Sequence, residues 1–138
     1  MRRDEAGEHK IGRGHLIGIR RNGAPASVIA MAKRLGLRYV AADDVSTMAF
    51  APQKRIAAVM SFSQDISPDG EVDMIETTER LIERVVALDG AFYLPYRLHA
   101  RRDQVQHAYA RTAYFIERKR LYDPGLLFRN AMWDAYFA

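Results

Sequence analysis

The chain has 138 residues, of which 49% are hydrophobic and 28% are charged, a balance typical of one folded domain and not of a disordered segment. It contains no cysteine, which excludes disulfides, thiolate metal sites and a cysteine nucleophile and fits a reducing, cytoplasmic compartment. No apolar stretch approaches the roughly 20 residues of a membrane-spanning helix, and the charged first ten residues do not resemble a secretory signal. We therefore expect no membrane span.

The charges are unevenly distributed along the chain. Lys and Arg number 21 against 17 Asp and Glu, a formal net charge of +4. Acidic residues dominate from Asp65 to Asp89, and basic residues dominate from Arg97 onward. A basic C-terminal third fits nucleic acid, an anionic ligand, the acidic surface of a neighbouring domain, or simply a solvated helix face.

The first half of the chain alternates strand-like and helix-like patterns. β-branched residues predict strands, apolar residues three and four apart predict a helix, and Asn22-Gly23 signals a turn. We expect Gly36 to stop that helix. In chain order the predictions are a loose tail over 1–13, a strand over 15–20, a helix over 24–35, a short strand over 37–41, and a loop or short helix over 43–52.

The middle of the chain gives the strongest secondary-structure signals. Residues 54–64 alternate between two sets of largely apolar or small residues, which predicts a central strand. Ser67 then fits a helix N-cap, with Pro68 at the first helical position. Apolar residues recur at helical spacing until Asp89-Gly90, where we expect the helix to end.

The second half predicts a further strand and further helices. Residues 91–94 read as a strand that Pro95 limits, and residues 102–121 read as one helix. A turn is expected at 123–125, followed by a short, aromatic-rich segment over 126–137. The alternation of strands and helices predicts an α+β fold, a small antiparallel or mixed sheet packed with helices and helical at its C-terminal end.

Common catalytic and binding motifs are missing from the sequence. The glycines form no dinucleotide or P-loop signature, the four histidines never pair at ligand spacing, and no Gly-x-Ser-x-Gly elbow occurs. The basic C-terminal third carries interleaved aromatic residues, but their helical spacing is typical of a core, and the net charge is small for a nucleic-acid binder. We therefore expect no metal and disfavour nucleic acid as a partner.

One short segment is dense in chemically useful side chains. Tyr93, Tyr96, Arg97 and His99 lie where the chain leaves the predicted strand at Pro95. Two phenols, a guanidinium and an imidazole in a cleft can orient a small polar substrate, bind an oxyanion or move a proton. The alternative is structural: packed tyrosines and salt-bridged arginines.

The C-terminal 75 residues also resemble a known family. Three segments in order carry the resemblance: residues 88–97 (LDGAFYLPYR), 108–109 (AY) and 119–130 (KRLYDPGLLFRN). Together they resemble the C-terminal end of FAD-linked oxidases of the vanillyl-alcohol-oxidase type, which include aldonolactone and alditol oxidases. In that family a separate domain binds FAD, a cap domain built of an antiparallel sheet with helices faces the substrate, and the final segment returns toward the flavin domain.

The resemblance implies a function and a division of the chain. Residues 14–121 correspond to the cap, or substrate, domain and residues 122–138 to the return segment, so the chain resembles the substrate-side part of a FAD-dependent oxidoreductase acting on a sugar-derived alcohol or lactone. The FAD-binding domain is then a partner, in the same or another chain, and we expect the 138 residues alone to be inactive and not to bind FAD tightly.

Site roles follow from the same resemblance. Tyr93, Tyr96, Arg97 and His99 correspond to the strand exit near the flavin ring and the substrate, although some relatives have lysine at the position of Tyr96. Asn130 matches the closing Asn of a Phe-x-Asn motif that lies close to the cofactor. Many relatives have proline where this chain has Ala110, and we expect alanine there to let the helix continue unbroken.

A different class of function remains open. The chain also fits a non-enzymatic α+β module that binds a small ligand or associates with itself. In that case the aromatic C-terminus, with Trp133, Tyr136 and Phe137, forms a homodimer contact.

Overall fold

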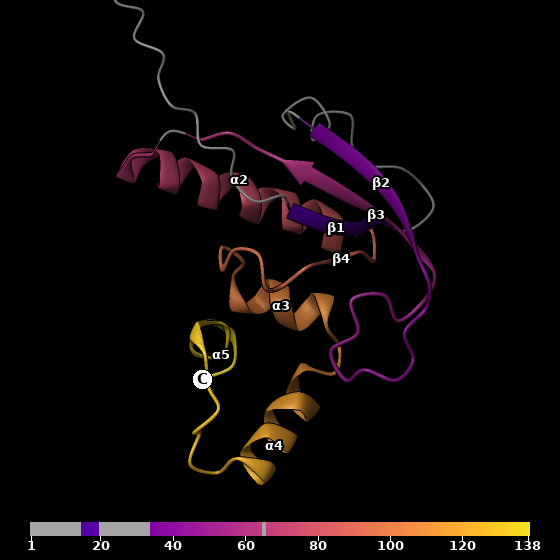
Figure 1. The fold of residues 1–138 in the computed structure, drawn as a ribbon, viewed down its shortest axis with the longest axis vertical. Helices are drawn as coiled ribbons and strands as arrows, with labels where there is room; N and C mark the ends of the chain where they lie inside the picture. Colours follow the sequence, from indigo (N-terminus) through magenta and orange to yellow (C-terminus); the bar gives the residue numbers. More distant parts are fainter. Residues whose placement is uncertain (1–14, 20–33, 65) are drawn as a thin grey trace, which may run out of the picture.

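The computed structural model describes residues 15–19, 34–64 and 66–138, and the structural statements below concern these residues. It has an α+β fold, with an antiparallel sheet packed against helices, as the sequence predicted (Figure 1). The strands are β1 (His15–Ile19), β2 (Arg34–Val40), β3 (Arg55–Ser61) and β4 (Ala91–Phe92). The helices are α2 (Pro68–Val86), α3 (Arg102–Ala108), α4 (Thr112–Tyr122) and α5 (Ala131–Tyr136).

The strands lie in the order β2-β3-β1-β4, and every neighbouring pair is antiparallel. Consequently β1 and β2 run in the same direction with β3 between them, and β3 and β4 run in the same direction with β1 between them. This strand order is that of the split β-α-β, or ferredoxin-like, arrangement. β3 lies between β2 and β1, which confirms the central position predicted for residues 54–64, although the strand itself spans only Arg55–Ser61.

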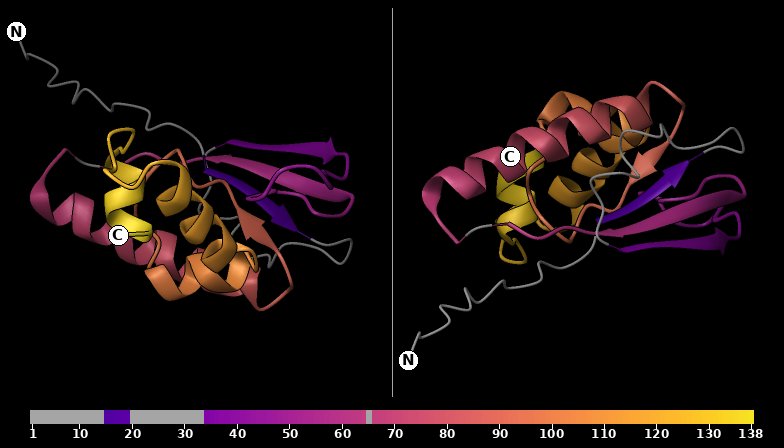
Figure 2. Two further views of the ribbon diagram at one scale, coloured as in Figure 1. Left: turned by 90° about the horizontal axis from the view of Figure 1, so that it is seen from below. Right: turned by 90° about the horizontal axis from the view of Figure 1, so that it is seen from above.

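One face of the sheet packs on the helices (Figure 2). The register pairs Ile17 with both Ala58 and Phe92, so Ala58, Met60 and Phe92 point to the same side. Met60 belongs to a core with residues of α2, and Phe92 belongs to a larger core with residues of α3 and α5. The sheet therefore packs on two apolar clusters, and α2 contributes to both, since its Ile82 belongs to the larger one.

Two predictions at the start of β2 are wrong. Residues 34 and 35, placed at the end of a predicted helix, belong to β2, and Gly36 pairs with Val59 in the middle of the ladder instead of stopping a helix. The ladder from Arg34 to Val40 is unbroken, so cross-strand pairing outweighs the local helical pattern. The predicted tail over 1–13 and residues 24–33 of the predicted helix lie outside the described residues.

Helix α2 agrees closely with its prediction. The Ser67 hydroxyl accepts a hydrogen bond from the Gly70 N–H at 3.0 Å, and Pro68 is the first helical residue. The helix ends at Val86, and Asp89 adopts a left-handed backbone conformation with φ of 54° just before Gly90. Ser67 and Gly90 thus bracket the element, as the sequence indicated.

The predicted helix over residues 102–121 is broken, which corrects the expectation that Ala110 lets it continue. It divides into α3 and α4 at Tyr109, whose backbone is non-helical with φ −127° and ψ 85°. The Tyr109 hydroxyl donates to the Phe92 carbonyl, and the Thr112 hydroxyl donates to the Tyr109 carbonyl at 2.6 Å. These contacts fix the break without proline.

The C-terminal segment belongs to the same core as the residues before it. Trp133, Tyr136 and Phe137 are each 4% exposed and pack with Phe92 and Val105, so the core crosses the predicted boundary at residue 122. The three aromatic side chains are thus unavailable as a dimer contact, which corrects that detail of the alternative prediction. No helix in the described part of the chain is long and apolar enough to cross a membrane.

Candidate functional site

Two of the sequence-predicted site residues converge on one carboxylate. Arg97 and His99 follow β4, while Glu71 lies in the first turn of α2. Arg97 Nη1 donates to Glu71 Oε2 at 2.9 Å, and His99 Nε2 lies 2.8 Å from Glu71 Oε1. Gln64 Nε2 donates to the same Oε2 at 2.8 Å, so Glu71 joins the β3–α2 connection to the loop after β4.

The contacts of Glu71 favour its charged form. The hydrogen bond from Gln64, followed by the contacts with His99 and Arg97, lowers the pKa of the Glu71 carboxyl below its usual value. The His99 side chain is only 8% exposed, whereas that of Arg97 is 28% exposed. Glu71, whose own side chain is 45% exposed, therefore anchors the buried His99 ring, and Arg97 keeps part of its guanidinium open to solvent.

The two predicted tyrosines form a separate pair. The Tyr93 and Tyr96 rings pack edge to face with centroids 4.7 Å apart, and Phe50 contacts Tyr93 with centroids 6.2 Å apart. Tyr93 is 39% exposed and Tyr96 is 43% exposed. The loop after β4 therefore presents two phenols at the surface.

Asn130 lies apart from this loop and has a structural contact. It is the N-cap of α5, where its side-chain oxygen accepts the Trp133 N–H at 3.0 Å. Its amide N–H groups stay available, because Asn130 itself is exposed.

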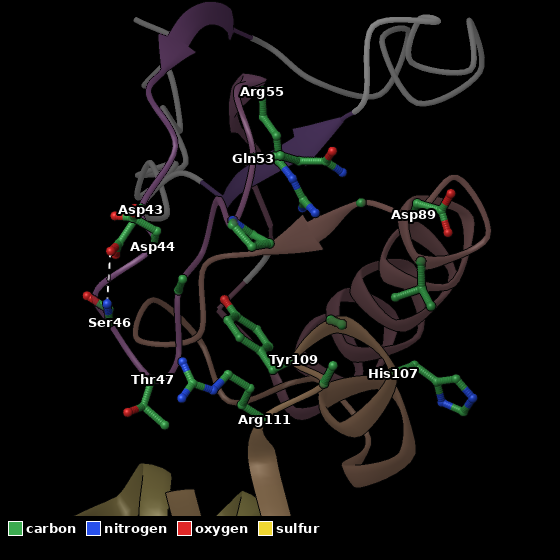
Figure 3. A pocket seen from close by; sticks show the side chains of 16 residues that line it. Asp43, Asp44, Ser46, Thr47, Gln53, Arg55, Asp89, His107, Tyr109 and Arg111 are labelled. Atoms are coloured by element: carbon green, nitrogen blue, oxygen red, sulfur yellow. Dashed lines mark hydrogen bonds between the residues drawn. The ribbon is translucent and has the colours of Figure 1, made fainter. Parts of the chain in front are cut away.

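A pocket of about 670 Å³ opens at the end of the sheet where β3 and β4 begin (Figure 3). Three connections form its walls: the β2–β3 loop, the α2–β4 turn and the break between α3 and α4. Its charged and polar lining includes Asp43, Asp44, Arg55, Tyr109 and Arg111. None of the five sequence-predicted site residues lines it.

The residues that line this pocket carry charges of both signs. In Figure 3 the Tyr109 side chain lies between Arg55 and Arg111, with Asp43 and Asp44 to one side. Arg55 is 7% exposed, and burial raises the pKa of the Tyr109 phenol well above its usual range, so that the phenol stays protonated at neutral pH. Hydrogen bonds from the backbone and side chain of Ser46 lower the pKa of Asp43. The pocket lining thus contains both guanidinium donors and carboxylate acceptors.

Sequence reasoning missed the pocket because its residues come from segments far apart. Arg55 reads as the polar start of a strand, and Tyr109 and Arg111 read as the interior of a helix. The pocket exists because that helix breaks at Tyr109, and no proline or glycine signals the break. Glu71 was missed similarly, since an acid in the first turn of a helix normally needs no further partner.

Comparisons with protein-family models, curated proteins and solved structures found no match to this chain. In the described ranges no group of three or more His, Asp or Glu residues is placed to hold a metal ion.

The described residues do not form a complete FAD site. Asn130 is the one residue that the resemblance assigns to the cofactor, and its side-chain oxygen already caps α5. The Tyr93 and Tyr96 phenols and the Arg97 guanidinium suit a small polar molecule better than a dinucleotide.

Proposed function

We propose that this chain is the substrate-side part of a FAD-dependent oxidoreductase that oxidises a sugar-derived alcohol or lactone in the cytoplasm. The observation that best supports this proposal is the structure of the loop after β4. There Arg97 and His99 are anchored on Glu71, and two phenols remain at the surface. An anchored loop with exposed donors is suited to hold a polyhydroxylated substrate in one orientation.

The packing of the segments that carry the resemblance also supports the proposal. The Tyr109 hydroxyl joins α3 to β4, and the Tyr136 hydroxyl accepts the Ala100 N–H at 3.3 Å, which joins α5 to the loop before α3. These segments therefore form one interdependent unit, as expected if they act together.

Within this proposal the residues have different roles. Tyr93 and Tyr96 contact the substrate, and the exposed part of the Arg97 guanidinium binds or polarises a substrate oxygen. His99 is largely buried against Glu71, so it positions the loop and does not itself receive the hydroxyl proton in this conformation. FAD would be held by a separate domain, in the same or a partner chain, and would supply the hydride acceptor.

The test is the flavin content and mass of the native protein. We expect an antibody against this chain to isolate, from source-cell extract, a polypeptide or complex that contains a flavin domain and roughly one FAD per chain, while the purified 138 residues bind no FAD. An isolated species of the mass of this chain without any flavoprotein contradicts the proposal. So does stoichiometric flavin on the 138 residues alone.

A second candidate is a stand-alone small-ligand-binding module, which the 670 Å³ pocket favours. In that case small polar ligands should raise the unfolding temperature of the purified chain, and Arg111→Ala should abolish the shift. Arg120→Ala is the matched control, because Arg120 is an exposed arginine of α4 outside the pocket lining.

A further inference from the structure

The two edges of the sheet differ in their capacity to pair with another strand. β4 has two residues and is soon followed by Pro95, so it offers little backbone to a partner. β2 has seven residues, contains no proline and runs in unbroken register with β3. Its outer edge pairs with no strand in the part of the chain that the structure describes.

β2 also carries an exposed apolar stripe. Leu35, Leu37 and Tyr39 alternate along the strand and so share one face, with exposed fractions of 38%, 68% and 64%. On β3, Ile56 pairs with Tyr39 of β2 and extends the stripe; it is 40% exposed. A long free edge beside exposed apolar side chains is a template for strand addition.

We propose that β2 pairs antiparallel with β2 of a second copy of this chain, about a two-fold axis at Leu37, to give a continuous eight-stranded sheet. This register sets Leu37 against Leu37 of the second copy and Leu35 against Tyr39. Both are apolar cross-strand pairs, which stabilise antiparallel sheets. The same pairing joins the two stripes on one face, because directly opposite residues point to the same side.

The charges on β2 select this register over its neighbours. With the axis at Leu37, Arg38 lies opposite Gly36 of the second copy, where the absent side chain leaves room for the guanidinium. An axis at Arg38 sets two Arg38 residues face to face, and an axis at Gly36 sets Arg38 against Arg34. Like charges directly opposite destabilise a ladder, so of these three registers only the one with its axis at Leu37 avoids them.

The first test measures oligomeric mass by light scattering after a charge is introduced at the axis. We expect the wild-type chain to show about twice its 15.7 kDa mass and to dissociate on dilution. Leu37→Lys and Leu37→Glu each place like charges at the two-fold axis and should be monomeric, whereas an equimolar mixture of the two should restore the dimer. Restoration on mixing excludes misfolding as the cause of dissociation.

The matched control is Val45→Lys, which adds the same charge at a residue that is 88% exposed in the β2–β3 loop. It should leave the dimer intact. A monomeric wild type at high concentration overturns the proposal, as does a dimer that Leu37→Lys leaves unchanged.

The second test fixes the register by cross-linking. The chain has no cysteine, so Leu37→Cys carries a single thiol. Opposite residues of an antiparallel pair lie about 4.5–5.5 Å apart between Cα atoms, within the range of a disulfide. Mild oxidation should convert Leu37→Cys, but not Val45→Cys, to a covalent dimer. Equal cross-linking of both variants contradicts pairing at Leu37. This proposal concerns β2 alone and stands or falls independently of the proposed oxidoreductase function.

Discussion

The Tyr109 hydroxyl donates a hydrogen bond to the backbone carbonyl of Phe92, and this contact links the break between α3 and α4 to the short strand β4. The two rings also pack edge to face, with centroids 6.1 Å apart. Tyr109 is 5% exposed and Phe92 is also 5% exposed, so both partners are shielded from water. Tyr109, which also lines the 670 Å³ pocket, is therefore held in place by β4.

Tyr109→Phe should reduce the free energy of unfolding by about 1–3 kcal/mol, because it leaves the buried Phe92 carbonyl without its donor. Urea denaturation followed by circular dichroism measures the change. Tyr122→Phe is the control, since Tyr122 is 79% exposed, and it should have almost no effect. Equal losses in the two variants would show that the Tyr109 hydroxyl is not structurally important.

Glu71→Gln should make stability less dependent on pH. Because its contacts lower the pKa of Glu71 in the folded chain, the charged carboxylate stabilises the fold above the unfolded-state pKa, near 4.5. That stabilisation is lost as the pH falls through the folded-state pKa. The urea midpoint of Glu71→Gln should thus lie below that of the wild type at pH 7, and the difference should shrink below about pH 4.

The control for this prediction is Glu83→Gln, an exposed glutamate on the same helix. It should change the urea midpoint little at either pH. A gap between wild type and Glu71→Gln that is the same at pH 7 and pH 3 would rule out the carboxylate charge as its source.

Asp123→Ala should unfold the turn between α4 and α5. The Asp123 carboxylate accepts the backbone N–H groups of Leu127 and Phe128 at 2.9 and 3.0 Å, and Lys119 pairs with it. Without these contacts we expect a lower urea midpoint and faster proteolysis between residues 124 and 129. Asp134→Ala, which removes only a surface ion pair to Arg129, should change neither. Similar proteolysis of both variants would contradict this role.

Trp133→Ala should reduce the free energy of unfolding by about 3–5 kcal/mol, because it removes a large buried side chain from the core around Phe137. Chemical denaturation measures the loss. Leu127→Ala, at an 83% exposed residue, should cost less than about 0.5 kcal/mol. A small effect at Trp133 would mean that α5 does not complete the core. Because the residue is structural, its substitution does not report cleanly on dimerisation.

Local patterns were sufficient for much of the fold. Ser67 and Pro68 mark the start of α2, and the alternation over residues 54–64 marks β3, because caps and apolar periodicity act within a few residues. The candidate loop was also recognised locally, from Tyr93 to His99. The partner that anchors it, Glu71, lies 28 residues before His99 and had no local signal.

The sequence by itself determined the α+β class, the limits of α2 and the central place of β3, since these follow from capping, periodicity and burial within single elements. Only the tertiary structure decided that Gly36 lies within a strand, that the helix breaks at Tyr109 and that Arg55, Tyr109 and Arg111 line one pocket. The reason is that these features depend on contacts between residues distant along the chain. Pairing with β3 overrides a helical pattern, and a buried phenol bonded to Phe92 bends a chain that contains no local breaker.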